Sequence, residues 1–182
     1  MPWWRASTTL GDVHGGAGEQ TVAVYTAIAE RAGVGGDIDA AVAAELDALA
    51  EQGIKYVPGF GHRFHPIDPR APRLLEMVDE MAERGAVTGR FAAIARAIEA
   101  AMEARKGKRI PMNIDGATAV IYAELGFAPP LCRGLFVLSR SVGILAHSWE
   151  QMQRAERNKG PLPRDATWTY TGPAQRKVPE QG

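Results

Sequence analysis

Histidine, arginine and aspartate side chains gather in one short stretch of the chain, VPGFGHRFHPIDPR at positions 57–70. Imidazole and guanidinium groups bind anionic oxygens, and an arginine can hold a carboxylate through two parallel hydrogen bonds. Three prolines and two glycines in the same stretch fix the backbone and let it approach a ligand closely. The combination is typical of a rigid loop that binds an anion, and its polar members are His62, Arg63, His65, Asp68 and Arg70.

Three further places hold polar side chains that look out of place. GDVHGGAGEQ puts His14 between glycines just before an expected helix, and NIDG puts Asp115 in the first turn of an otherwise apolar one. In SRSVGILAHSWEQ, Arg140 and His147 are seven residues apart and therefore share one face of a helix. These sites indicate a particular chemistry only when they are taken together with the loop.

Each site also has a simpler structural interpretation when it is taken alone. A histidine before a helix is usually a cap or a satisfied surface residue, and Asp115 complements the helix dipole. Arg140 alone is most simply a partner in a structural ion pair, and DPR at 68–70 is an ordinary turn signal. Cys132 and the methionines are expected to pack in the core.

A metal site is the competing use of the same groups, with His14, His62, His65 and Asp115 as ligands. HRFH does place two histidines three residues apart. Pro66 and the rigid loop do not give a helical pair of ligands, so no metal is expected. His65 is then expected to form a hydrogen bond within the loop or to line a ligand site.

The composition limits the class of protein. Of 182 residues, 46% are hydrophobic and 23% are charged, which is ordinary for a globular protein with a core. Lysine plus arginine and aspartate plus glutamate balance at 21 each, so neither nucleic acid nor a membrane surface is expected as a partner. Cys132 is the only cysteine, which excludes an intrachain disulfide and fits a reducing, cytoplasmic setting. The chain has no run of about 18 apolar residues, so a transmembrane helix is not expected.

Apolar periodicity predicts an all-α fold with six helices. Asp37 and Asn113 are placed to cap the second and the fifth helix, and glycines follow most helix ends. Pro72 falls in the first turn of the third, where its missing N–H does no harm. The sixth should present an apolar face of Leu135, Leu138, Val142, Leu145 and Trp149. The expected ranges are 19–31, 38–52, 71–84, 91–104, 114–125 and 131–157.

Together the motifs resemble those of the citrate synthase family over about residues 10–172. LGDVHGGAGE is similar to the family's glycine-flanked histidine motif, and VPGFGHR followed by DPRA is similar to its most recognisable signature. NIDGATAVIYAELGF resembles the segment with the catalytic aspartate, and SRSVGILAHSWEQ resembles the helix with a substrate-binding arginine. The motifs occur in the family's order and at about its spacing.

The resemblance implies an enzyme that makes or breaks the carbon–carbon bond between acetyl-CoA and oxaloacetate. It would be a citrate synthase or a citryl-CoA lyase, with a coenzyme A thioester as substrate and no permanently bound cofactor or metal. Asp115 would be the base, His14 the donor to the thioester oxygen, and His62 the group that polarises the oxaloacetate carbonyl. The implied substrate-binding arginines are Arg70, Arg140 and Arg164. The implied coenzyme A contacts are Val57, Pro58, Gly59, Gly61 and Arg63, and His65 would either line the same site or form a hydrogen bond within the loop.

Two features set the chain apart from most citrate synthases. The interval between GHR and DPR is one residue shorter, which resembles the compact bacterial citryl-CoA lyases. Only about ten residues precede LGDVHGG, whereas family members carry a long helical region there. We therefore expect an N-terminally shortened chain, whose incomplete large domain would expose apolar helix faces.

The expected organisation has three parts. Residues 1–18 would be a remnant of the large domain with the first histidine motif, 19–127 the small, coenzyme A-binding and catalytic domain, and 128–182 the C-terminal part of the large domain. The resemblance implies a homodimer in which Arg164 reaches the partner's site, or a separate chain that supplies the N-terminal half. The alternative from another class is a non-catalytic coenzyme A-binding fragment or partner subunit.

Overall fold

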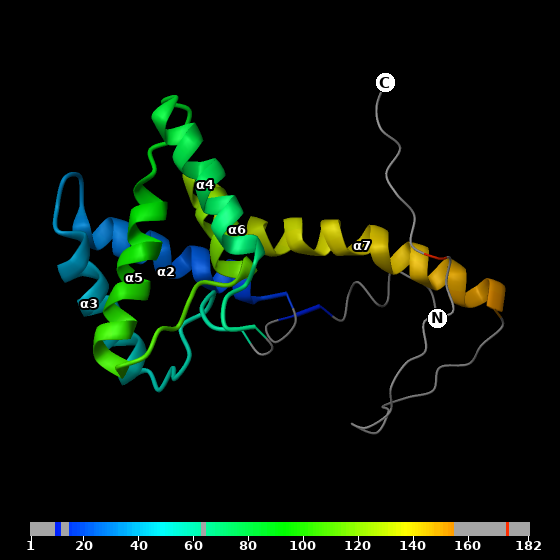
Figure 1. Ribbon diagram of the computed structural model, residues 1–182, viewed down its shortest axis with the longest axis horizontal. Helices are drawn as coiled ribbons and strands as arrows, with labels where there is room; N and C mark the ends of the chain where they lie inside the picture. Colours follow the sequence, from blue (N-terminus) through cyan, green and yellow to red (C-terminus); the bar gives the residue numbers. More distant parts are fainter. Residues whose placement is uncertain (1–9, 12–14, 63–64, 155–173, 175–182) are drawn as a thin grey trace.

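The structure, a computed structural model, describes residues 10–11, 15–62, 65–154 and 174. Within these residues it is all-helical, as predicted, and the backbone pairs in extended form only at two isolated bridges. Figure 1 shows the helices as a bundle from which the last one projects. They are α2 (Ala17–Ala32), α3 (Ile38–Glu51), α4 (Arg70–Glu83), α5 (Arg90–Lys106), α6 (Ile114–Glu124) and α7 (Pro129–Arg154).

Local signals in the sequence set the starts of two helices. The Asp37 side chain accepts a hydrogen bond from the Ala40 N–H at 3.0 Å, which confirms it as the cap of α3. Asn113 caps α6, because its side-chain oxygen accepts from the N–H groups of Asp115 and Gly116 at 2.9 and 3.2 Å. The Asn113 cap therefore fixes the backbone of the first turn of α6, which carries the candidate base Asp115.

Three helices extend two residues beyond a predicted end, and the first of them, α2, begins at Ala17 instead of at 19. α5 continues to Lys106 instead of ending at 104, and it is closed by Gly107, whose φ of 65° is in the left-handed region. α7 begins two residues early, at Pro129, since proline is compatible with the first turn of a helix. Pro72 lies in the first turn of α4, as predicted.

The core surrounds α2, which contacts α3, α5, α6 and α7. The side chains of Val22, Tyr25 and Ile28 are fully buried there, and each such burial contributes about 1.5–3 kcal/mol. The Tyr25 hydroxyl donates a hydrogen bond to the Gly116 carbonyl at 3.3 Å. This bond ties the central helix to the first turn of α6.

The sulfur-containing side chains follow the expectation only in part. Cys132 is buried, as predicted, and so are Met102 and Met112. The prediction is wrong for Met77 and Met152, which are 45% and 71% exposed. These two lie on the outer faces of α4 and α7, where no other described helix covers them fully. An apolar side chain in a helix is buried only if another element covers its face.

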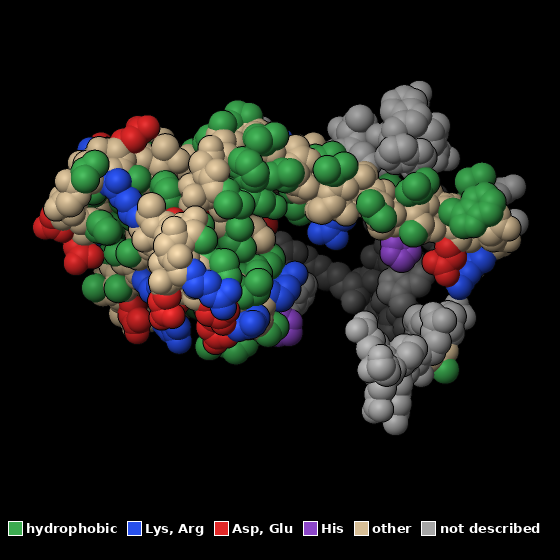
Figure 2. Space-filling view, turned by 90° about the horizontal axis from the view of Figure 1, so that it is seen from above, with side chains coloured by type: hydrophobic (Ala, Val, Ile, Leu, Met, Phe, Trp, Pro, Cys, Tyr) green, Lys and Arg blue, Asp and Glu red, His purple; other side chains and the backbone are tan. Residues whose placement is uncertain are grey.

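α7 leaves the bundle as a long single helix (Figure 1). Its beginning packs on α2, where Arg133 and Glu19 form an ion pair. Farther along, hydrophobic side chains open to solvent follow one another on the projecting helix, as Figure 2 shows. We call these residues the α7 apolar face; they are 49–71% exposed and comprise Leu131, Leu138, Val142, Leu145, Trp149 and Met152. None of the described helices combines the length and the apolar character that a membrane span requires.

Candidate active site

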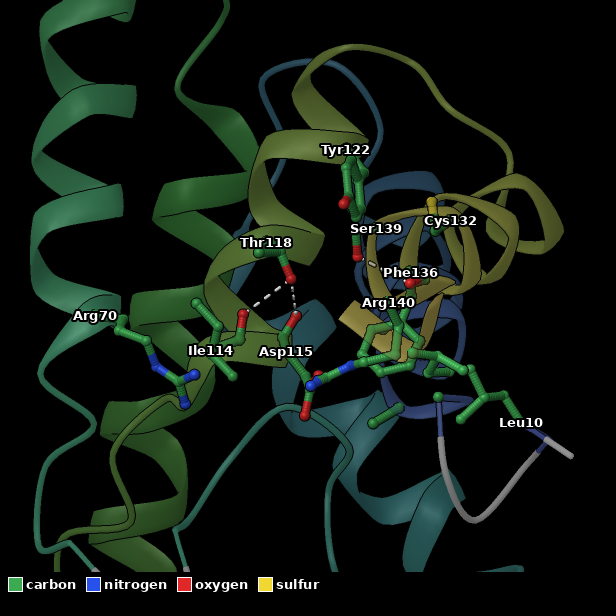
Figure 3. A pocket seen from close by; sticks show the side chains of 14 residues that line it. Leu10, Arg70, Ile114, Asp115, Thr118, Tyr122, Cys132, Phe136, Ser139 and Arg140 are labelled. Atoms are coloured by element: carbon green, nitrogen blue, oxygen red, sulfur yellow. Dashed lines mark hydrogen bonds between the residues drawn. The ribbon is translucent and has the colours of Figure 1, made fainter. Parts of the chain in front are cut away.

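A cavity of about 760 Å³ opens where the starts of α2, α4 and α6 meet α7. Three predicted site residues line it together, Arg70 from α4, Asp115 from α6 and Arg140 from α7 (Figure 3). They are 45 and 25 residues apart in sequence, so only the packing of the helices brings them to one place. The rest of the lining is mostly apolar or small and comprises Leu10, Gly15, Ala17, Gly18, Ile114, Thr118, Tyr122, Cys132, Phe136, Ser139 and Ile144.

Asp115 has the environment of a carboxyl group with altered proton affinity. Its side chain is partly buried in the cavity wall, and this burial raises its pKa. The positive charges of Arg70 and Arg140 oppose the rise in pKa, and the negative charge of Asp68 adds to it. In Figure 3 the Arg140 side chain extends towards the Asp115 carboxylate. A carboxyl group in this environment can exchange a proton with a ligand in the same cavity.

Arg70 is held by a residue whose role the sequence did not indicate. The Nε–H and Nη2–H groups of Arg70 donate to the two carboxylate oxygens of Asp68 at 2.9 and 2.8 Å. These hydrogen bonds keep the pKa of Asp68 well below its ordinary range and raise that of Arg70. DPR is more than an ordinary turn, because the buried carboxylate of Asp68 holds the exposed guanidinium of Arg70. Only the burial of Asp68 could have shown this, and burial is not visible in the motif.

Arg140 lies over the ring of Phe136, with 5.2 Å between its guanidinium carbon and the ring centroid. Such a contact orients a cation and is worth about 0.5–1 kcal/mol at an exposed site. Phe136 in turn packs against Gly15, where a Cβ atom would lie 2.9 Å from the ring. The glycine that follows His14 therefore borders the cavity, although His14 itself is outside the described residues.

His62 does not line this cavity and lies on the loop between α3 and α4. Its Nδ1 accepts a hydrogen bond from the backbone N–H of His65 at 3.0 Å, and the two rings are 4.9 Å apart. A neutral imidazole that accepts at Nδ1 carries its proton at Nε2, so this nitrogen can donate to an acceptor oxygen. The expectation that His65 forms a hydrogen bond within the loop is confirmed, through its backbone.

The His62 loop is fastened to the segment that carries Asp115. The Gly61 N–H donates to the Pro111 carbonyl at 2.7 Å, and the Asn113 N–H donates to the Gly59 carbonyl at 2.9 Å. The Asn113 amide also donates to the Gly61 carbonyl at 2.8 Å. Two motifs more than 50 residues apart in sequence are therefore joined as one rigid unit.

The remaining predicted residues, apart from Gly59, fall into three groups. Val57, Pro58 and Gly61 are partly buried, and Val57 borders a second cavity of about 400 Å³ that also has Lys55, Arg105 and Lys106 in its wall. His147 shares α7 with Arg140, as expected, but it is 85% exposed beside Glu150 at 3.6 Å. Arg63 and Arg164 lie outside the described residues.

Gly59 is buried, and its missing side chain permits close approach within the protein. A Cβ atom at this position would lie 2.7 Å from Thr21 and 2.8 Å from the Gly116 Cα. Its contact with coenzyme A remains a prediction. Among the described residues, no three His, Cys, Asp or Glu side chains are grouped so that they could hold a metal ion.

The geometry defines a class of all-helical protein in which one cavity holds a carboxyl group and two arginines. The model of the family "Citrate synthase, C-terminal domain" matches residues 6–164, so the chain belongs to the citrate synthase family. The resemblance found in the sequence is confirmed, and so is the expected fold class.

Two curated relatives and two solved structures give the extent of the likeness. The citrate synthase of Acidithiobacillus ferridurans is 31% identical over 93% of this chain, and citrate synthase 2 of Bacillus subtilis is 31% identical over 92%. The citryl-CoA lyase of Hydrogenobacter thermophilus covers 94% of this chain with a TM-score of 0.65 and 27% identity. The citrate synthase of Thermoplasma acidophilum, solved with carboxymethyl coenzyme A and oxaloacetate, covers 92% with a TM-score of 0.63 and 29% identity.

The chain spans only part of these proteins. It matches 41% and 40% of the two curated relatives, 63% of the citryl-CoA lyase and 42% of the Thermoplasma enzyme.

Proposed function

We propose that the protein acts on the carbon–carbon bond between the acetyl unit of acetyl-CoA and oxaloacetate. The observation that carries this proposal is the meeting of Asp115 with Arg70 and Arg140 in one cavity. Arginines bind carboxylates, of which oxaloacetate and citryl-CoA have two or more, and a partly buried carboxyl group can exchange a proton with the carbon beside the thioester. Family membership supports the same reaction class.

The proposed chemistry moves one proton at each end of the bond. In the direction of synthesis, Asp115 takes a proton from the acetyl-CoA methyl group, and the resulting enolate attacks the oxaloacetate carbonyl. The Nε2–H of His62 donates a hydrogen bond to that carbonyl oxygen and stabilises the alkoxide that forms, which takes up a proton from water to become the hydroxyl group of citryl-CoA. His14 would donate to the thioester oxygen of the enolate. Each such group typically contributes about 10²–10⁴ in rate.

We favour citryl-CoA lyase over citrate synthase. In the lyase direction the hydroxyl group of citryl-CoA loses its proton to water while the Nε2–H of His62 stabilises the alkoxide, the carbon–carbon bond breaks, and protonated Asp115 gives its proton to the departing enolate. The short interval between GHR and DPR supports this choice, and so does the likeness to the solved citryl-CoA lyase, which extends over 63% of that protein. A citrate synthase would add hydrolysis of the citryl thioester.

Coenzyme A is proposed to bind along Val57, Pro58, Gly59, Gly61 and Arg63. The attachment of this loop to the start of α6 supports the proposal, since it holds the loop at a fixed place beside the segment with Asp115. We propose no metal and no permanently bound cofactor. A cytoplasmic location is also proposed, because a single buried cysteine suits a reducing compartment.

The products formed from citryl-CoA test the function. We expect the purified chain to release acetyl-CoA and oxaloacetate, which chromatography separates from free coenzyme A and citrate. Citrate and coenzyme A would instead identify a synthase at its second step. A chain that binds coenzyme A thioesters and turns over none of them would support the non-catalytic alternative.

We propose a homodimer that uses the α7 apolar face. Apolar residues recur along α7 at alternating intervals of three and four, at positions 131, 135, 138, 142, 145, 149 and 152. This spacing is that of helices packed along their length. Small uncharged residues flank the row, among them Ser139, Ser141, Ala146 and Ser148, so a second helix can approach closely. A second copy offers the same face and can cover it symmetrically.

Charge placed on this face is expected to break the association. The unchanged chain should sediment as a dimer, and Val142→Glu should shift it to a monomer that binds a hydrophobic dye. Met77→Glu is the matched control, because Met77 is also an exposed apolar residue but lies on α4. A monomeric unchanged chain that binds no dye would contradict the proposal. A monomer that binds dye would point to a different chain as the partner.

A further inference from the structure

Asp68 is the only charged residue among the described ones that is buried, with no exposed surface at all. All of its hydrogen-bonding directions are occupied. Oδ1 accepts from the backbone N–H and the Nε–H of Arg70 at 3.1 and 2.9 Å. Oδ2 accepts from the Nη2–H of Arg70 at 2.8 Å and from the Ile114 N–H at 2.9 Å. A carboxylate with four protein donors has little capacity left for a ligand. Its role must therefore depend on the two groups that it binds, the Arg70 guanidinium and the Ile114 N–H.

On one side Asp68 fixes the guanidinium of Arg70. An arginine has five N–H donors, and the two that Asp68 engages lie along the Nε–Nη2 edge. The edge formed by Nη1 and the second hydrogen of Nη2 then points away from Asp68. That edge can bind a carboxylate through two parallel hydrogen bonds, and the Arg70 side chain is 57% exposed, so a ligand can reach it.

On the other side Asp68 fixes the start of α6. The N–H of Ile114 is among the backbone donors of the first turn that no helical carbonyl can satisfy. By accepting from it, Asp68 attaches the residue beside Asp115 to the start of α4. One carboxylate therefore bridges the arginine that would bind substrate and the backbone that carries the candidate base.

We propose that Asp68 is a positioning residue, which orients Arg70 towards a substrate carboxylate and holds Asp115 at a fixed position relative to Arg70. The inference rests on the proposed function, and it deepens that function by naming the group that sets the geometry between binding and proton transfer. Asp68 touches no substrate in this account and acts only through its two neighbours.

The bridge also has an electrostatic consequence at Asp115. The charged groups that face Asp115 are Arg70 from α4, Arg140 from α7 and Asp68 from the loop. The negative charge of Asp68 raises the pKa of Asp115, whereas the two arginines lower it. Removal of the Asp68 charge leaves both arginines uncompensated and is expected to lower the pKa of Asp115. The shift reports the loss of a negative charge close to Asp115, and the loss of oxaloacetate affinity reports the positioning of Arg70.

The test compares Asp68→Asn with Asp79→Asn in the full chain. Asp79 also forms a two-bond pair with an arginine, Arg96, at 3.0 and 2.6 Å, but the pair lies on the exposed surface of α4 and α5. Calorimetric titration with oxaloacetate measures binding, and the carbon NMR signal of the Asp115 carboxyl group reports its pKa.

We expect oxaloacetate to bind about 10–100-fold more weakly to Asp68→Asn, as for the loss of a hydrogen bond between charged groups. Binding of coenzyme A should stay within about twofold, and the Asp115 titration should move to lower pH. Asp79→Asn should match the unchanged chain in all three measurements.

A second variant covers the case in which Asp68→Asn does not fold. Arg70→Lys keeps the positive charge but lacks the planar fork, and it should lose oxaloacetate affinity to a similar extent. Unaltered oxaloacetate binding in Arg70→Lys, or in a folded Asp68→Asn with an unmoved Asp115 titration, would overturn the positioning role and leave the proposed function standing. If the unchanged chain binds neither oxaloacetate nor citryl-CoA, the proposed function itself fails.

Discussion

Replacement of Asp115 by asparagine is expected to lower turnover of citryl-CoA by about 10²–10⁴-fold. Asparagine keeps the shape and polarity of the side chain but can neither give nor take the proton at the carbon beside the thioester. The arginines that bind the carboxylates remain in place, so oxaloacetate and citryl-CoA should still bind. Steady-state kinetics and calorimetry on the same preparation separate the two quantities.

Asp39→Asn is the matched control for this substitution. Asp39 and Asp115 both occupy the second position of a helix, α3 and α6, behind a capping side chain, but Asp39 is exposed to solvent. Both variants lose the same favourable interaction with the helix dipole, about 0.3–1 kcal/mol. A loss of turnover confined to Asp115→Asn therefore reports chemistry. Equal activity of the two variants would show that Asp115 is only a complement to the dipole.

The raised pKa of Asp115 gives this prediction a pH dependence. In the cleavage of citryl-CoA, Asp115 must carry the proton that it gives to the enolate, so the rate falls as the pH rises through the pKa of Asp115, which burial places above its ordinary value of about 3.9. The same shift means that ionised Asp115 costs stability at neutral pH, because its proton is held more tightly in the folded chain than in the unfolded one. The asparagine variant should therefore lose less stability than Asp39→Asn, and a larger loss would argue against the partly buried environment.

Replacement of Gly59 by alanine is expected to destabilise the fold by about 2–4 kcal/mol. Part of this, about 1 kcal/mol, arises because Gly59 has a φ of 83°, which a residue with a side chain adopts at a cost. The rest, about 1–3 kcal/mol, comes from overpacking. The new methyl group would meet Thr21 and the backbone of Gly116 at under 3.0 Å, and the backbone cannot turn away as a flexible side chain can.

Gly53→Ala separates the two contributions. Gly53 has a similar φ of 76°, but a Cβ atom there would meet nothing within 4 Å. We expect it to cost only the conformational part, about 1 kcal/mol. Urea unfolding of both variants measures the difference in the free energy of unfolding. Equal costs would show that the approach of Gly59 to α6 is looser than the structure indicates.

The sequence by itself determined the helices and the family. Helix starts and ends depend on groups within a few residues of each other, as when Asn113 accepts from the N–H groups of Asp115 and Gly116. Such local interactions can be predicted from a single sequence, and so can the apolar spacing along α7. The motifs around His62 and Asp115 indicated the family for a similar reason, because each is a continuous stretch of chain.

Only the tertiary structure decided which residues meet and which are buried. Arg70, Asp115 and Arg140 share a cavity because helices far apart in sequence pack together, and spacing along the chain does not encode that distance. The role of Asp68 depends on its burial, and the role of Gly59 depends on a neighbour 57 residues away. The α7 apolar face shows the same limit: periodicity predicts that a helix face is apolar, but burial requires a partner surface that the helix itself does not specify.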